Sequence, residues 1–285
     1  MWRYHGALIL CLLTTPAWVR TCHYSWWSDN PQPYLQALQK AYPATTPSPA
    51  PGARIRAGIV THHFLASGLM VRFFETLRGQ TSPETIILIG PDHFHHGAEN
   101  ISLSSLPWKT PFGLLETNTG MVEQFKAATH LSEDTEAFTG EHSVGVLVPF
   151  LKYYFPHSRV VPILIDVNAQ QGRLMDLRSL LATFLRDPHV LILLSMDFSH
   201  KSVASIADSR DAQAQEAITS LDLTKVEGLN VDCRKGLWLL MAAMRDLGQV
   251  KVRISEHTNS ARLTGNLHQA DVTSYFSVFF LFPSS

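Results

Sequence analysis

Short, nearly continuous apolar runs recur along the chain and predict buried strands. Three of them, Ile55–Thr61, Thr85–Gly90 and Val190–Met196, lead within a few residues to a histidine. Runs of this kind are typical of strands buried on both faces, as in the parallel sheet of an α/β protein. Further strands are predicted at Val160–Asp166, Val250–Glu256 and Val272–Phe282, and the last of these could pair antiparallel.

Segments with helical periodicity alternate with these strands. They predict helices at about Tyr34–Ala41, Leu65–Leu77, Thr119–Ala128, Val144–Phe155, Gln170–Arg186, Ser202–Leu221 and Val231–Leu247. A loop-rich section around Pro107 and Pro111 interrupts the alternation. The pattern predicts a three-layer α/β/α sandwich around a mainly parallel sheet, formed by a single domain over residues 54–285.

The first 53 residues differ in composition from the rest of the chain. Residues 1–20 carry Arg3 and His5 before a short apolar stretch, which fits a secretory signal peptide and is too short to predict a membrane span. Export or membrane association through this stretch is therefore favoured, and a cytoplasmic chain stays possible. Residues 21–53 hold an aromatic cluster, Tyr24–Trp27, and a linker over Pro43–Gly52 with four prolines.

Composition limits the kinds of partner. The chain has 285 residues, 45% of them hydrophobic, which is enough for a large core. The net charge is −1 and only 16% of residues are charged, so a nucleic-acid partner is not expected. Histidine is abundant, and seven of the fourteen histidines fall near the segments discussed below: His62, His63, His93, His95, His96, His142 and His200.

The histidines that follow strands point to one site. In open α/β sheets, the loops beyond the carboxyl ends of the strands build the ligand site. Adjacent side chains of an extended segment face opposite ways, so only one of His62 and His63 is expected to enter a shared site. His93 follows a sharp exit at Gly90-Pro91. These residues predict a metal or acid/base centre, with a surface histidine pair as the alternative at His62-His63.

Two further motifs carry titratable groups. Asp197 and His200 are three residues apart and could hydrogen-bond, which would hold His200 as a general base. Alternatively, Asp197 caps the helix expected after it. Glu141 and His142 open a helix, where an acidic residue would also complement the helix dipole.

Cys233 begins a helical pattern, where a lowered thiol pKa would favour metal binding. The alternative is a small buried hydrophobic residue. If the protein is exported, Cys22 could pair with Cys233, although we expect Cys233 to be free. Zinc-finger spacing, HExxH, a P-loop, a dinucleotide fingerprint and a GxSxG elbow are absent from the sequence.

Taken in order, these segments resemble the Memo family, which includes the AmmeMemoRadiSam system protein B proteins and is similar in fold to class III extradiol dioxygenases. The resemblance covers residues 54–250 and rests on Gly58–His63, Ile87–His93, Glu141–Ser143 with Pro149, Leu194–His200 and Asp232-Cys233. It implies a dioxygenase subunit-B-like fold. It also implies metal ligands at His63, His93 and Cys233, with Asp197, His200, Glu141 and His142 around the same pocket as catalytic or lining residues.

The sequence departs from the family pattern at three places. Thr61-His62-His63-Phe64 stands where the family commonly has Pro-His-Ala-Gly, which leaves His62 and His63 as alternatives, with His63 favoured. Arg234 follows the cysteine in place of glycine, and Lys201-Ser202 stands where relatives can carry Trp-Gly.

Two functions of different classes follow from this site. A His/His/Cys set suits one softer or borderline transition metal ion, with iron or copper favoured and zinc possible, in a metal-dependent oxidoreductase. The alternative is a binding module that uses the pocket for a peptide, a small molecule or a protein partner. A zinc hydrolase is a third possibility.

Overall fold

The computed structural model describes residues 22–41 and 53–283. The predicted signal peptide and the whole of the proline-rich linker lie outside these ranges. No helix among the described residues is both long enough and apolar enough to cross a membrane.

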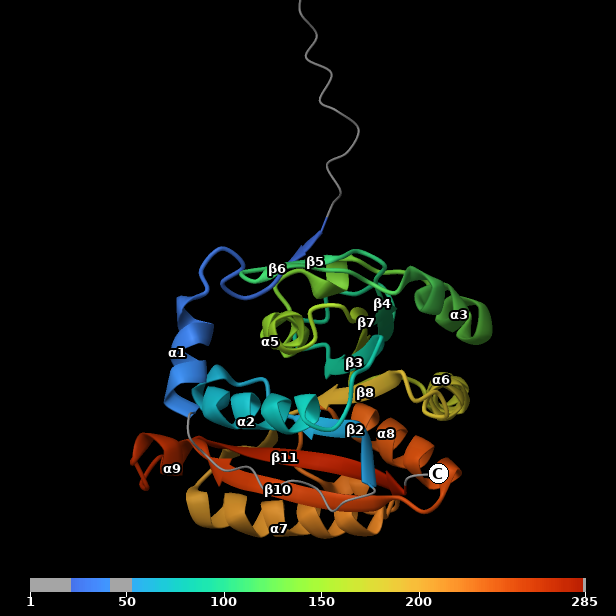
Figure 1. Ribbon diagram of the computed structural model, residues 1–285. Coiled ribbons are helices and arrows are strands. Elements are labelled where there is room, and N and C mark those ends of the chain that lie inside the picture. Colours follow the sequence, from blue (N-terminus) through green and yellow to red (C-terminus); the bar gives the residue numbers. More distant parts are fainter. Residues whose placement is uncertain (1–21, 42–52, 284–285) are drawn as a thin grey trace, which may run out of the picture.

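A mixed eight-stranded sheet forms the centre of the molecule (Figure 1). Its strands are β2 (Ala53–Val60), β3 (Thr85–Pro91), β4 (Ile101–Leu103), β7 (Arg159–Ile165), β8 (Val190–Ser195), β9 (Phe198–Ser202), β10 (Lys251–Asn259) and β11 (Val272–Pro283). The order is β10-β11-β2-β8-β3-β7-β4, and β9 pairs with β11. The four strands β2, β8, β3 and β7 are parallel to their neighbours in that group. Antiparallel strands flank this parallel centre on both sides.

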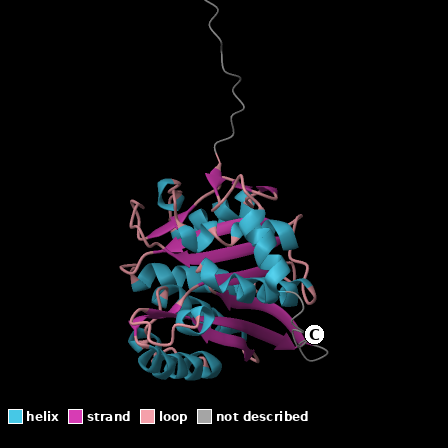
Figure 2. Cartoon of the chain, turned by 90° about the vertical axis from the view of Figure 1, so that its left-hand side faces the viewer, coloured by secondary structure: helices cyan, strands magenta, loops and turns pink. Residues whose placement is uncertain are grey.

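Helices cover both faces of the sheet (Figure 2). They are α1 (Gln32–Ala41), α2 (Ser67–Arg78), α3 (Thr119–Thr129), α4 (His142–Gly145), α5 (Val148–Tyr154), α6 (Gln171–Phe184), α7 (Ala204–Ser220), α8 (Arg234–Leu247) and α9 (Ser260–Thr264). Alternate residues of a strand face opposite layers. In β3, Ile87 and Ile89 pack in the core under α6 and α8, whereas Ile86 and Leu88 pack under α2 and α5. Both faces of the central strands are therefore buried, which explains why they read as continuous apolar runs.

The N-terminal segment packs against this body. A small sheet joins β1 (His23–Tyr24), β5 (Trp108–Thr110) and β6 (Gly113–Leu115) in the order β1-β5-β6. Tyr34 of α1 is fully buried, and its ring lies edge-on to Phe64 and Phe150. The predicted aromatic cluster thus belongs to a segment that covers the domain near the end of β2.

The predicted layers and the antiparallel last strand are confirmed, and the sheet is more mixed than expected. Strands β4, β5 and β6 occupy the section around Pro107 and Pro111 that the sequence predicts as loops. The helix expected from Ser202 begins at Ala204, because β9 precedes it. This short strand carries His200, so it also changes the interpretation of the site.

Candidate metal centre

The titratable side chains predicted from the sequence meet at the carboxyl edge of the parallel strands. His62 follows β2, His93 follows β3, and Asp197 follows β8. They border a cavity of about 490 Å³ together with Trp26, His63, Phe64, Leu65, His142, Val146, His200 and Thr273. These side chains therefore lie together at one edge of the sheet.

His62 is the member of the His62-His63 pair that is buried in this cluster, being 2% exposed. Its Nδ1 lies 2.9 Å from Ser195 Oγ, whose own hydrogen is donated to the carbonyl oxygen of Ser143. Ser195 Oγ must then accept from His62, so Nδ1 carries a proton and Nε2 is the nitrogen left for another partner. Burial lowers the pKa of His62, but the carboxylates of Asp197 and Asp232 outweigh burial and hold it above its usual value.

His93 is fixed in a similar way by a buried carboxylate. Its Nδ1 lies 2.9 Å from Glu141 Oε1, and its backbone N–H donates to Glu141 Oε2 at 2.8 Å. Glu141 also caps α4 by accepting from the backbone N–H of Ser143. Burial opposes charge on both groups, yet their contact holds the pKa of Glu141 at about 2 and, with Asp232, raises that of His93 to about 10. Carboxylate contacts of this kind orient metal-binding imidazoles.

His142 joins the cluster from the start of α4. Its ring stacks on that of His93 with centroids 4.1 Å apart, and lies 5.2 Å from the ring of His62. Burial lowers the pKa of His142 to about 4. The nitrogens of His62, His93 and His142 are close enough to one another to hold a metal ion, so the pocket is a possible metal site.

A second group that could hold a metal ion shares His62 and adds Asp197 and Asp232. Asp232 Oδ2 lies 3.3 Å from His62 Nε2, 3.8 Å from His93 Nε2 and 3.6 Å from His200 Nε2. Burial raises the pKa of this carboxyl, but the surrounding histidines outweigh burial and hold it well below its usual value. Asp232 is the site residue that the sequence analysis missed, although it stands beside Cys233 in the matching segment.

Contrary to the prediction, Asp197 and His200 do not hydrogen-bond to each other, and each has other partners. Asp197 Oδ1 accepts from the Thr61 hydroxyl and from the backbone N–H of His62 at 3.2 Å. It does not cap α7, whose N-cap residue is Val203. His200 is nearest to Asp232 among the carboxylates, because β9 turns it toward the segment before α8. Both residues still border the cavity.

His63 lies at the rim rather than inside the histidine cluster. It is exposed, and its Nδ1 lies 2.5 Å from the hydroxyl of Tyr275. Adjacent residues of an extended segment face opposite ways, and the buried position falls to His62. The choice of His63 rather than His62 as the family's metal ligand therefore has no support in this geometry.

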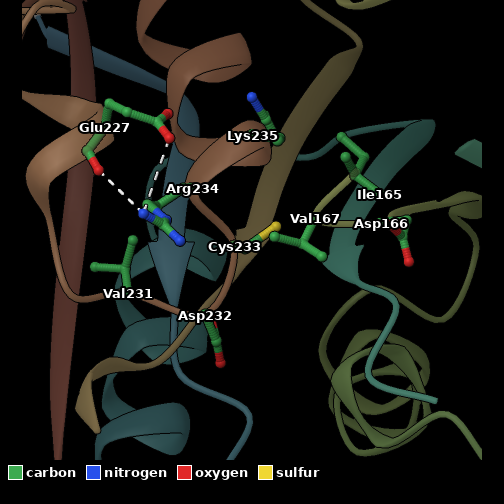
Figure 3. A pocket seen from close by; sticks show the side chains of 9 residues that line it. All are labelled: Ile165, Asp166, Val167, Glu227, Val231, Asp232, Cys233, Arg234 and Lys235. Atoms are coloured by element: carbon green, nitrogen blue, oxygen red, sulfur yellow. Dashed lines mark hydrogen bonds and ion pairs between the residues drawn. The ribbon is translucent and has the colours of Figure 1, made fainter. Parts of the chain in front are cut away.

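Cys233 is not part of the site, which corrects the His/His/Cys prediction. It is 3% exposed, packs in the core between the sheet and α8, and its thiol pKa is raised well above the usual value by burial. In Figure 3 its sulfur points toward Val167, whereas the carboxylate of Asp232 points to another side. Neither group of potential metal ligands among the described residues contains a cysteine. Cys22 and Cys233 are both free, as expected for Cys233.

Trp26 covers one side of the cavity. Its backbone N–H donates to the carbonyl oxygen of Gly145 at 3.1 Å, and its ring lies 5.9 Å from that of His142. Gly145 permits this approach, since a Cβ there would lie 3.3 Å from the Trp26 ring. The aromatic N-terminal segment therefore contributes directly to the pocket.

Comparison with known proteins agrees with the sequence motifs. A family model described as Memo-like protein matches residues 22–278. A MEMO1 family protein of Pyrobaculum aerophilum is 27% identical over 252 residues, which cover 84% of this chain and 88% of that one. One from Caldivirga maquilingensis is 30% identical over 213 residues, or 70% of this chain and 72% of that one. The crystal structure of an uncharacterised protein from Escherichia coli K12 shares the fold, with a TM-score of 0.54 at 12% identity over 79% of this chain and 99% of that one.

Proposed function

Since the chain belongs to the Memo-like protein family, we propose that its histidine pocket binds one transition metal ion and serves a metal-dependent oxidoreductase. This proposal rests on how the imidazole rings of two histidines are hydrogen-bonded. His62 and His93 both border the cavity and each has Nδ1 engaged by a protein acceptor, while the Nε2 atoms lie 3.3 and 3.8 Å from Asp232 Oδ2. A metal ion is the ligand that such paired, pre-oriented imidazoles favour.

The absence of a thiolate from the cluster changes which metal is favoured. Copper(I) prefers soft sulfur ligands, whereas imidazole with carboxylate suits iron(II), copper(II) or zinc. Iron is therefore our first choice, with copper and zinc as alternatives. A similarity to class III extradiol dioxygenases fits this choice and forms part of the proposal.

When bound, an iron ion would supply redox chemistry to a small molecule in the cavity. The protein's own contribution is orientation and proton transfer. Asp197 and Glu141 hold the histidines from outside, through the backbone of His62 and the ring of His93. His200 borders the cavity with an Nε2 that is buried and has no hydrogen-bond partner, so it is placed to exchange a proton with a bound molecule.

Metal content tests this function. Full-length protein purified without chelator or nickel should contain near-stoichiometric metal, and His62→Ala and His93→Ala should lose it. His63→Ala is the matched control, because it removes an adjacent imidazole at the rim and should leave the metal in place. A metal-free wild type, or full retention in both cluster variants, would contradict the proposal.

A binding module for a peptide or protein is the second candidate. Apolar side chains stand at the mouth of the cavity, where Trp26 is 41% exposed and Leu65 44% exposed. A wild-type protein that holds no metal under reducing conditions would favour the binding module. Stoichiometric zinc would instead favour the hydrolase, in which a metal-bound water is the nucleophile.

A further inference from the structure

We infer that Asp232 is the third protein ligand of the metal, so that His62, His93 and Asp232 form a site of two histidines and one carboxylate. This inference rests on the proposed function, since it names the ligands of the same metal. It also replaces the thiolate that the sequence suggested with the carboxylate one residue before it.

The Nε2 atoms of His62 and His93 both lie close to a single oxygen atom of Asp232. Asp232 Oδ2 is 3.3 Å from the Nε2 of His62 and 3.8 Å from the Nε2 of His93. Two ligand atoms that each bind a metal at about 2.1 Å lie about 3.0–3.4 Å apart when they are adjacent, depending on the coordination geometry. The distance to His62 already matches this separation, and a side-chain shift that shortens the distance to His93 would place the oxygen there for both nitrogens. The Nε2 atoms are the ones available to a metal ion, which would displace any proton on them, because the Nδ1 atoms of both rings are engaged by Ser195 and Glu141.

The orientation of the histidine rings favours Asp232 over His142, which is the other candidate for the third metal ligand. The lone pair of an imidazole nitrogen lies in the plane of its ring. The planes of His62 and His93 are at 76°, so they intersect near both rings and their lone pairs can meet. The planes of His93 and His142 are only 25° apart and the rings are stacked, so one metal ion cannot lie in both planes without rotation of a ring.

The carboxylate is held in place by the backbone. The N–H of Asp197 donates to Asp232 Oδ1 at 3.0 Å, and the N–H of Asp232 donates to the carbonyl oxygen of Asp197 at 3.2 Å. These bonds join the end of β8 to the segment before α8 and turn the Asp232 side chain toward the histidines. The neighbouring Cys233 faces the apolar side, where its sulfur packs near Leu194 and Ile89.

A separate observation indicates that a bound group completes this cluster. His200 Nε2 is buried without a hydrogen-bond partner, 3.6 Å from Asp232 Oδ2. Buried polar atoms are nearly always satisfied in proteins, by other groups, water or ions. A ligand set of two histidines and one carboxylate with open positions is the one found in non-haem iron(II) oxygenases.

Cobalt(II) titration of the full-length protein tests the ligand set, because a thiolate bound to cobalt(II) gives an intense near-ultraviolet charge-transfer band. We expect cobalt(II) to bind the wild type without that band. Asp232→Asn should weaken binding at least about tenfold, since even loss of an outer contact costs that much. Asp232→Cys should bind and acquire the band, a gain that a merely structural role of Asp232 would not produce.

Cys233→Ser and Glu227→Gln are the matched controls, one for the adjacent thiol and one for an exposed carboxylate five residues before Asp232. Both should bind cobalt(II) within a few-fold of the wild type. A thiolate band in the wild type that disappears in Cys233→Ser would overturn the inference, as would wild-type affinity in Asp232→Asn together with no band in Asp232→Cys. A wild type that binds no metal would overturn the proposed function as well, so the two failures are distinguishable.

Discussion

The α-carbon of Gly90 lies against the side chain of Ser143, so closely that a Cβ on Gly90 would be 2.7 Å from Ser143 Oγ. Ser143 Oγ also donates to the carbonyl oxygen of Pro91 at 2.9 Å. This contact seats α4 on the end of β3 and brings Glu141 and His142 to His93. The glycine that the sequence marks as a sharp strand exit is thus also what permits the cluster to assemble.

Gly90→Ala should destabilise the protein by about 1–3 kcal/mol, the usual cost of inserting a methyl group into a packed interior. It should also weaken metal binding, because α4 must move away from β3. Denaturant unfolding and cobalt(II) titration measure the two effects. Gly172→Ala, at a helical glycine with open space around it, is the control and should not destabilise the protein. Equal stability of Gly90→Ala and the wild type would show that α4 can be displaced without cost.

Glu141→Gln should reduce metal affinity by about 10- to 100-fold, as is typical when the carboxylate partner of a metal-binding histidine is removed. The amide keeps a carbonyl oxygen to accept from Ser143 N, so the cap on α4 can survive. Competition with a chelator of known affinity measures the change. Glu136→Gln, at an exposed position of the preceding turn, should leave the affinity unchanged. A similar loss in both variants would assign the effect to net charge instead of the contact with His93.

Cys233 should resist thiol reagents in the native protein. Its side chain is buried and burial raises its pKa, so the reactive thiolate is scarce and shielded. Peptide mapping after alkylation should find Cys22, which is partly exposed, modified first, and Cys233 modified only in denaturant. Rapid native labelling of Cys233, suppressed by added metal, would instead restore it as a candidate ligand.

Acid should weaken the attachment of the N-terminal segment through His23. Burial lowers the pKa of His23 to about 4, against 6.5 in an unfolded chain. Between these values the unfolded state binds more protons, so the free energy of unfolding falls as the pH falls, by at most about 1.4 kcal/mol per pH unit. His23→Phe keeps a ring against Trp108 and Phe138 and cannot be protonated.

The difference between the unfolding free energies of wild type and His23→Phe, measured from pH 8 to pH 4, isolates this contribution. We expect the wild type to lose stability relative to the variant only below about pH 6.5. A constant difference over the whole range would show that His23 is not buried as a neutral group.

The apolar runs were sufficient to predict the parallel centre of the sheet. A strand buried on both faces must be apolar at every position, so β3 and β8 are visible in the sequence to within a residue of their observed ends. Because parallel strands end at one edge, the sequence also predicted that His93 and Asp197 would meet there, and the family resemblance added Glu141. Short elements were missed: β9 holds Ser199 and Lys201 at positive φ on either side of His200, a conformation that no hydrophobic pattern encodes.

The sequence by itself determined the layers of the fold, the edge at which the site lies and most of the residues that line it. Only the tertiary structure decided which of two adjacent residues enters the site. His62 rather than His63, and Asp232 rather than Cys233, lies in the histidine cluster. Adjacent residues face different sides of the backbone, and which side is the pocket depends on contacts between distant segments. At Asp232 those contacts are the hydrogen bonds with Asp197, thirty-five positions away, which a local pattern cannot contain.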